Sequence, residues 1–170
     1  MEINREDGNQ LAAAFIPDFK LESAPEDVRR RAKVCLLDLV GACLAGARSN
    51  GAEILLRFCL SQFAGPPEAT VIRAGRKLSC SAASLVNGFI ANALDIDDGY
   101  RPVKGHPGAA VFPAVLAIAE KVGATGRQFL EALIVAYEIA MRAGLAIQAH
   151  YGYYHSSGAW GAIGSAAGAA

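Results

Sequence analysis

The feature that most constrains the fold is a helical repeat of apolar residues that returns in several stretches of the chain. The first stretch places one apolar face along positions 28–44, formed by Val28, Ala32, Cys35, Leu36, Leu39, Val40, Cys43 and Leu44. Ser23, Pro25 and Glu26 precede it in the pattern of a capping box, which predicts the start of a helix there. The pattern ends near Gly46, and a shorter helix is expected over 53–63.

The only β signal follows this second helix. Residues 70–72 and 77–78 flank a Gly-containing turn, a pattern that predicts a small irregular hairpin. Ser79 or Ser81 then begins a third helix, which is expected to run through Leu94.

Two further helices complete the periodic part of the sequence. One is expected from Pro107 to Glu120, with Pro113 either kinking it or restarting it. Thr125 and Gln128 form a capping box at the start of the next helix. The predicted fold class is therefore all-α, a multi-helix domain with one short irregular β-hairpin.

The last segment interleaves glycines with alanines: Gly158, Gly161, Gly164 and Gly168. Glycine costs about 1 kcal/mol in a helix interior, so a helix here needs close backbone packing to be stable. The pattern runs up to Ala170 without a cap or breaker. We therefore expect residues 1–170 to be a truncated, partial N-terminal helical domain.

Charge and hydropathy argue against nucleic acid and membranes as binding partners. Sixteen basic and sixteen acidic residues cancel, and nucleic acid or an anionic membrane would require a basic surface, so neither is expected. The longest apolar run, 111–119, is far shorter than the roughly 20 residues of a membrane span. The first seven residues lack an apolar h-region, which argues against a secretory signal.

The four cysteines sit among apolar residues without metal-type spacing: Cys35, Cys43, Cys59 and Cys80. They are expected to be free, small, buried side chains in a reducing compartment rather than a zinc site or redox pair. The expected location is the cytoplasm.

The candidate acid–base centre is the acidic run that follows the third helix. Asp95, Asp97 and Asp98 are placed at the C-terminal end of that helix, where the helix dipole disfavours carboxylates. His106 follows at the entry to the next helix, whose N-terminus favours an anion. Three carboxylates placed against the dipole, with a titratable imidazole nearby, indicate proton-transfer chemistry.

The same loop supplies cations that could bind an acidic substrate. Arg101 and Lys104 lie between the aspartates and His106, and together with Asn92 they are the candidate substrate-binding residues. His155 lies beside a second helix start, so both histidines could face one bound anion. The expected ligand is a small carboxylic acid.

Familiar metal motifs fail on these residues. An EF-hand loop beginning at Asp95 needs glycine and glutamate where Tyr100 and His106 stand, and an Asp-Asp-x-x-Asp site fails at Arg101. No metal is expected, although a divalent-metal site on the aspartates and His155 is an open alternative.

With these residues in hand, the sequence resembles the MmgE/PrpD family, which includes 2-methylcitrate dehydratase, cis-aconitate decarboxylase and iminodisuccinate epimerase. The ordered matches are the Leu-Asp-Leu-Val-Gly element within 32–46, Asn87-Gly88, Ala93 to Asp98, His106-Pro107, the segment from Phe112 to Glu120, Tyr154-His155, Gly158 and 161–170.

The resemblance implies a helical domain that is joined in the family to a smaller α+β domain, which is absent from these 170 residues. It also implies a homodimer or higher oligomer that works without metal or organic cofactor. Carried over by position, Asp95, His106 and His155 match the family's active-site residues, and further lysines and a tyrosine lie beyond position 170. Gly105 and Gly108 stand where threonine and serine are usual, which removes two hydroxyls.

Two functions are consistent with these features. The leading hypothesis is a lyase-type enzyme fragment that transfers a proton next to a carboxylate of a di- or tricarboxylic acid. Hydro-lyase chemistry like that of 2-methylcitrate dehydratase is expected first, decarboxylation or epimerisation next, and the chain alone is expected to be nearly inactive. The alternative is an inactive helical module retained for dimerisation, or the remnant of a truncated gene.

Overall fold

The computed structural model describes residues 7–170, so the expectation about a signal in the N-terminal residues falls on positions 1–6, outside the described residues, and on Asp7. This part of the chain forms seven α-helices, two short 3-10 turns and one hairpin, in agreement with the predicted fold class. In chain order they are α1 (Gly8–Asp18), η1 (Leu21–Ser23), α2 (Glu26–Gly46), α3 (Asn50–Gln62), β1 (Ala69–Val71), β2 (Arg76–Leu78), α4 (Cys80–Asn92), η2 (Arg101–Val103), α5 (Pro107–Val122), α6 (Gly126–His150) and α7 (Ser157–Ala169).

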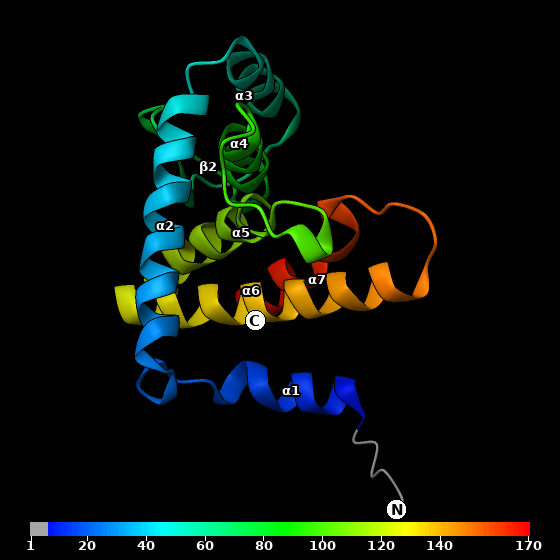
Figure 1. Cartoon of the computed structure of the whole chain (residues 1–170). Coiled ribbons are helices and arrows are strands. Elements are labelled where there is room, and N and C mark those ends of the chain that lie inside the picture. Colours follow the sequence, from blue (N-terminus) through cyan, green and yellow to red (C-terminus); the bar gives the residue numbers. More distant parts are fainter. Residues whose placement is uncertain (1–6) are drawn as a thin grey trace, which may run out of the picture.

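Helix α5 is the centre of the packing. It contacts α4, α6 and α7 directly, and α2 runs along one side of the molecule, crossing α6 (Figure 1). Val111, Phe112 and Val115 of α5 are buried in the common core. The helix continues through Pro113, so of the two expected outcomes, a kink or a restart, the restart is wrong. Proline removes one helical hydrogen bond, and the buried residues on both sides offset that loss.

The glycine-rich segment forms α7, which packs closely on α6 and α5. A Cβ on Gly164 would lie 2.4 Å from Cβ of Ala140, and a Cβ on Gly161 would lie 2.5 Å from Cβ of Ala110. The prediction of close backbone packing is therefore confirmed. The close contact of Gly161 with Ala110 fixes the start of α7 relative to the start of α5.

The hairpin is tied to the helices through its first strand. Strands β1 and β2 pair antiparallel with Thr70 opposite Lys77. The buried side chain of Asn87 on α4 accepts from the N–H of Ile72 at 3.0 Å and donates to the carbonyl of Thr70 at 2.9 Å. Glu120 at the end of α5 accepts from the N–H of Thr70. The hairpin therefore joins α4 to the C-terminal end of α5.

The starts of α4 and α6 agree with the sequence, whereas α3 begins at Asn50, before the expected position 53. Ser49, Ser79 and Thr125 cap α3, α4 and α6 with side-chain hydrogen bonds, and the Thr125 capping box is complete. The capping box predicted at Ser23 is wrong. The Ser23 hydroxyl donates to the carbonyl of Lys20 at 2.7 Å within the preceding turn, and Pro25 occupies the N-cap of α2.

Helix α1 was not predicted from the sequence. It contains no buried residue and lies below α6 in Figure 1, with only a small contact to that helix. The turn after it is attached to α6, because Glu131 accepts from the N–H of Leu21 at 2.9 Å and Arg127 pairs with Glu22.

Two expectations about composition can be compared with the fold. All four cysteines are free, as expected; Cys43 and Cys59 are buried, but Cys35 and Cys80 are only partly buried, so the expected burial holds for two of the four. Within residues 7–170 we find no helix with the length and apolar character needed to cross a bilayer.

Candidate functional site

The acidic run lies in the loop that joins α4 to α5. It was expected at the C-terminal end of the helix, but α4 ends at Asn92 and all three aspartates follow it. The N–H of Asp95 donates to the carbonyl of Asn92 at 3.0 Å, and Asp95 has a positive φ of 54°. Aspartate is among the few residues that adopt this left-handed backbone readily. The turn brings the Asp95 carboxylate beside His106, the N-cap of α5.

The imidazole of His106 lies between two carboxylates. Its Nε2 is 3.2 Å from Oδ1 of Asp95, and its Nδ1 is 3.3 Å from Oδ2 of Asp97. The side chain of Asp95 is 81% exposed, whereas that of Asp97 is 0% exposed. His106 is therefore bounded by a buried carboxylate on one side and by an accessible one on the other.

Asn92 forms a hydrogen bond with the buried carboxylate of Asp97. Its Nδ2 donates to Oδ1 of Asp97 at 2.8 Å. Oδ2 of Asp97 and Nδ1 of His106 are at ion-pair distance but not aligned as a hydrogen bond, and neither has another hydrogen-bond partner within residues 7–170. A continuous line of contacts thus runs from Asn92 through Asp97 and His106 to Asp95.

The third aspartate binds α5 and α6 to the loop. Oδ1 of Asp98 accepts from the N–H of Gly108 at 3.1 Å, and Oδ2 accepts from the hydroxyl of Tyr137 at 3.0 Å. Burial raises the pKa of Asp98, and the neighbouring charge of Asp97 adds to this, while the hydrogen bonds from Tyr137 and Gly108 act in the opposite direction. Burial and the Asp98 charge raise the pKa of Tyr137.

The start of α7 closes the other side of the site. Ser157 Oγ accepts from the backbone N–H of His106 at 2.8 Å, and the Tyr154 hydroxyl donates to the carbonyl of Lys104 at 3.3 Å. A Cβ on Gly105 would lie 2.3 Å from Ser157 Oγ. The Ser157 hydroxyl therefore occupies the space that any side chain at position 105 would need.

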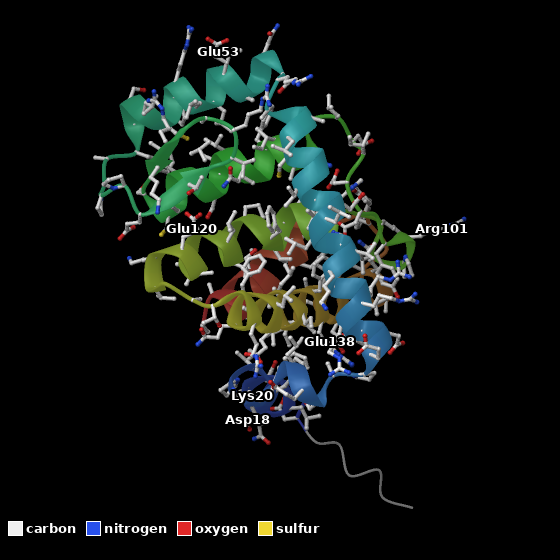
Figure 2. All side chains as sticks on the ribbon, turned by 90° about the vertical axis from the view of Figure 1, so that its left-hand side faces the viewer. Asp18, Lys20, Glu53, Arg101, Glu120 and Glu138 are labelled. Carbon is white, nitrogen blue, oxygen red and sulfur yellow. The ribbon has the colours of Figure 1, made fainter. Side chains whose placement is uncertain are left out.

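A cleft of about 850 Å³ opens at this junction. Five of the six residues assigned to the site from sequence line it together: Asn92, Asp95, Arg101, Lys104 and His106. Arg101 projects from the edge of the molecule in Figure 2, and Lys104 adopts a left-handed backbone with a φ of 54°. Two cations and the free N–H groups at the start of α7 favour an anionic ligand in this cleft.

His155 is the sixth residue, and it does not line the cleft among the described residues, although its neighbours Tyr154 and Ser156 do. Its Nε2 is buried without a hydrogen-bond partner within residues 7–170, and its ring meets that of Tyr151 edge-on at 5.5 Å. Gln148 donates to its backbone carbonyl at 3.0 Å. The structure thus brings His106, but not the ring of His155, to the wall of the cleft.

Among residues 7–170, the group that could hold a metal is Asp95, Asp97 and His106. Each can offer one ligand atom, and these atoms lie within 4.8 Å of one another. His155, which the metal alternative required, is not a member of this group. A divalent ion would also have to share the cleft with Arg101 and Lys104.

Sequence reasoning gave no individual role to Asp97, Tyr137 or Ser157. Asp97 was visible as part of the acidic run, but only burial distinguishes it from Asp95. Tyr137 lies in the helix that follows the Thr125 capping box, and its hydroxyl partner, Asp98, is 39 positions away in the sequence. The position of Ser157 before a glycine-rich helix was the only signal for its contact with His106.

Comparison with known proteins covers almost the whole chain. The model of the MmgE/PrpD N-terminal domain matches residues 10–170. The cis-aconitate decarboxylase-like protein oryM of Aspergillus oryzae is 30% identical over 140 residues, which cover 78% of this chain and 29% of that protein. Cis-aconitate decarboxylase of Aspergillus terreus is 33% identical over 131 residues, which cover 74% of this chain and 26% of that protein. The aligned part is thus less than a third of each relative.

Proposed function

This chain belongs to the MmgE/PrpD family, a family of lyase-type enzymes, and from that premise we propose that it carries part of an acid–base site for a small di- or tricarboxylic acid. The reaction would transfer a proton at a carbon next to a carboxylate, with His106 as the acid or base. Asp95, His106 and His155 are the proposed catalytic residues. Arg101, Lys104 and Asn92 are the proposed substrate-binding residues.

The observation that carries the proposal is the position of His106. Its ring lies between Asp95 and Asp97 on the wall of a cleft that Arg101 and Lys104 also line. A carboxylate bound by these cations would place its neighbouring carbon within reach of the imidazole. Histidine is the commonest general acid–base residue, and a carboxylate partner orients the ring for this role.

The names of the matched relatives favour decarboxylation over the dehydration that the sequence suggested first. In a decarboxylation, the bond to one carboxylate carbon breaks, carbon dioxide leaves, and the electron pair remains on the adjacent carbon. His106 would deliver a proton from Nε2 to that carbon. The ring would regain that proton at Nε2 from solvent water in the cleft, and the carboxylate of Asp95 beside Nε2 would stabilise the protonated ring.

His155 requires a further assumption in this scheme. Its Nε2 is directed into the protein, so it would need to turn toward the cleft on substrate binding. The lysines and the tyrosine implied by the family resemblance would complete the carboxylate contacts, and without them we expect the 170-residue chain to turn over substrate very slowly. A homodimer, no cofactor and a cytoplasmic location stay predictions.

The alternative, a helical module that serves dimerisation, is supported by apolar side chains on the outer face of α2. Val34, Leu37 and Leu44 recur there at helical spacing, and Leu37 is 74% exposed. This alternative predicts no affinity of the cleft for carboxylic acids, so ligand binding separates the two functions.

Calorimetric titration of the chain with cis-aconitate, 2-methylcitrate and iminodisuccinate tests the binding half of the proposal. At least one acid should bind, and the double substitution Arg101→Ala with Lys104→Ala should weaken binding by about tenfold or more, roughly 1.4 kcal/mol. Arg57→Ala on the outer side of α3 is the matched control, because Arg57 is exposed and pairs with Glu53. No binding, or an equal loss in the Arg57 variant, would overturn the proposal.

Turnover tests the chemical half. Release of carbon dioxide from cis-aconitate is followed for the chain alone and for a full-length protein that carries it. His106→Ala should abolish any turnover while leaving the circular dichroism spectrum unchanged. Undiminished release in that variant would remove His106 from the reaction.

A further inference from the structure

We infer that Asp97, held by Asn92, is a positioning residue that fixes which ring nitrogen of His106 carries the hydrogen in the neutral imidazole. Nδ1 of His106 would carry the hydrogen and point at Asp97. Nε2 of His106 would then be the atom that exchanges protons in the cleft. The catalytic consequence rests on the proposed function, whereas the state of the ring can be measured without it.

The burial of Asp97 provides the first step. Its side chain is 0% exposed, and a buried carboxylate is costly unless donors satisfy it. Asn92 Nδ2 satisfies Oδ1 at 2.8 Å. For Oδ2, the nearby donor is Nδ1 of His106 at 3.3 Å, and both atoms lack any other hydrogen-bond partner within residues 7–170. The two atoms are not aligned as a hydrogen bond in this structure, so a hydrogen on Nδ1 together with a slight turn of the ring would give Oδ2 its donor among the described residues.

The backbone around His106 provides the second step, because hydrogen bonds fix the main chain there and only the imidazole ring can still turn. The N–H of His106 is bound to Ser157 Oγ at 2.8 Å, and the N–H of Gly108 is bound to Asp98 at 3.1 Å. Both ties hold the start of α5 without touching the ring. The direction of the ring is therefore left to the two carboxylates.

The contrast between the carboxylates provides the third step. Asp95 is 81% exposed and lines the cleft, so water or a substrate can satisfy its oxygens in any state of His106. Asp97 has no such alternative. The hydrogen bond made at one ring nitrogen sets which nitrogen is free at the other. Asp97 accordingly determines the tautomer, and Asp95 faces the reacting group.

Nitrogen NMR of the imidazole measures this directly. The chain contains three histidines, His106, His150 and His155, so single substitutions of the other two assign the signals. At a pH where the ring is neutral, two-bond proton–nitrogen spectra distinguish the two tautomers. Wild type should have His106 with its hydrogen on Nδ1. A wild-type ring with the hydrogen on Nε2 would overturn the inference.

Isosteric substitutions separate the two aspartates. In Asp97→Asn the amide can place an N–H₂ group toward Nδ1, so the hydrogen should move to Nε2. In Asp95→Asn, the matched control, the hydrogen should stay on Nδ1. An unchanged tautomer in Asp97→Asn, or a change in Asp95→Asn alone, contradicts the assignment. If Asp97→Asn fails to fold, Asn92→Ala tests the same contact and should yield a mixture of tautomers.

Kinetics of an active full-length form add the functional readout. Asp97→Asn should lower kcat by roughly 10³–10⁴-fold, the scale seen when a buried carboxylate that orients a catalytic histidine is replaced by its amide. KM should change little, because Asp97 does not line the cleft. Equal losses in kcat and affinity would indicate a general loss of structure instead. A tautomer change without any carboxylic acid binding would leave Asp97 a positioning residue and refute the proposed function alone.

Discussion

The hydroxyl of Tyr137 donates to Oδ2 of Asp98 at 3.0 Å, and this contact joins α6 to the loop that carries Asp95 and His106. Asp98 is adjacent in sequence to Asp97, and its other oxygen holds the first turn of α5 at Gly108. The position of the acid–base residues therefore depends on a partly buried phenol–carboxylate pair that does not itself line the cleft.

The pH dependence of stability should report on Asp98. Burial raises its pKa in the folded chain above the ordinary value of about 3.9. Between the ordinary value and the raised one, the folded chain binds more protons than the unfolded chain. The contribution of Asp98 to the free energy of unfolding is thus fully present below the ordinary value and is lost as pH rises through the raised one. Urea unfolding across this window measures it.

Asp98→Asn supplies the control for that slope. The variant should lose the part of the slope that belongs to Asp98, while other carboxylates contribute equally to both proteins. Parallel curves for wild type and variant would contradict the assignment.

Removing the hydroxyl of Tyr137 should destabilise the chain. Tyr137→Phe leaves Oδ2 of the partly buried Asp98 without its donor, which should cost about 0.5–1.5 kcal/mol, the typical net contribution of one hydrogen bond. Tyr153→Phe is the matched control, because Tyr153 is 84% exposed and its loss should change stability by less than about 0.5 kcal/mol. Chemical denaturation of both variants measures the difference, and equal effects would refute the role of the contact.

The close packing of α7 can be tested with two glycines of the same helix. Gly164→Ala places a Cβ 2.4 Å from Cβ of Ala140 and 2.5 Å from a backbone oxygen, so it should cost about 1–3 kcal/mol or more. Gly158→Ala meets nothing within 4 Å and should be neutral or stabilising by up to about 1 kcal/mol. A stabilised Gly164 variant would mean that α7 does not approach α6 as described.

Divalent metal ions should leave the chain unchanged. The cluster of Asp95, Asp97 and His106 is already linked by internal contacts, and Arg101 and Lys104 share its cleft. A ligand that binds the folded state raises the Tm with its concentration. Thermal unfolding with added magnesium or manganese should therefore give a constant Tm. A rise that Asp95→Asn removes would establish a metal site instead.

The outer face of α2 should promote self-association. Val34, Leu37 and Leu44 form an exposed apolar stripe on the helix nearest the viewer in Figure 2. Light scattering should detect dimers or larger species, and Leu37→Lys should shift them toward the monomer. Ile54→Lys on α3, which is also exposed, should have a smaller effect. A monodisperse monomer at all concentrations would contradict the expected oligomer.

Local patterns in the sequence predicted most of the fold, because helical periodicity and caps act over short distances. Thr125 capped α6 as expected, since both partners of the box lie within one turn. The cap predicted at Ser23 was wrong because the Ser23 hydroxyl donates instead to the carbonyl of Lys20, in a turn that the pattern could not reveal. Helix α1 lacks a buried face, so there was no strong apolar stripe to detect.

Five residues that line the cleft were expected from the sequence, but His155 does not line it among the described residues, and the geometry could not be foreseen. Asp95 and His106 flank one loop, so their contact could be expected from the sequence. Arg101 and Lys104 belong to the same loop and line the same cleft. The separate environments of Asp95 and Asp97 depend on how α4 and α5 pack, and the contact of Ser157 with His106 spans 51 positions in the sequence. The ring of His155 likewise meets that of Tyr151, a contact that the sequence pattern did not indicate.

The space beside Gly108 has a consequence for how this chain can change over evolutionary time. A Cβ there would lie 2.1 Å from Oδ1 of Asp98 and 2.4 Å from the hydroxyl of Tyr137. The three positions therefore share one small volume and cannot vary independently. A larger residue at 108 becomes acceptable only after a smaller or shifted partner appears at 98 or 137, so mutations at these sites should be strongly epistatic. Such coupling would restrict the order in which related sequences acquire a different residue beside the histidine.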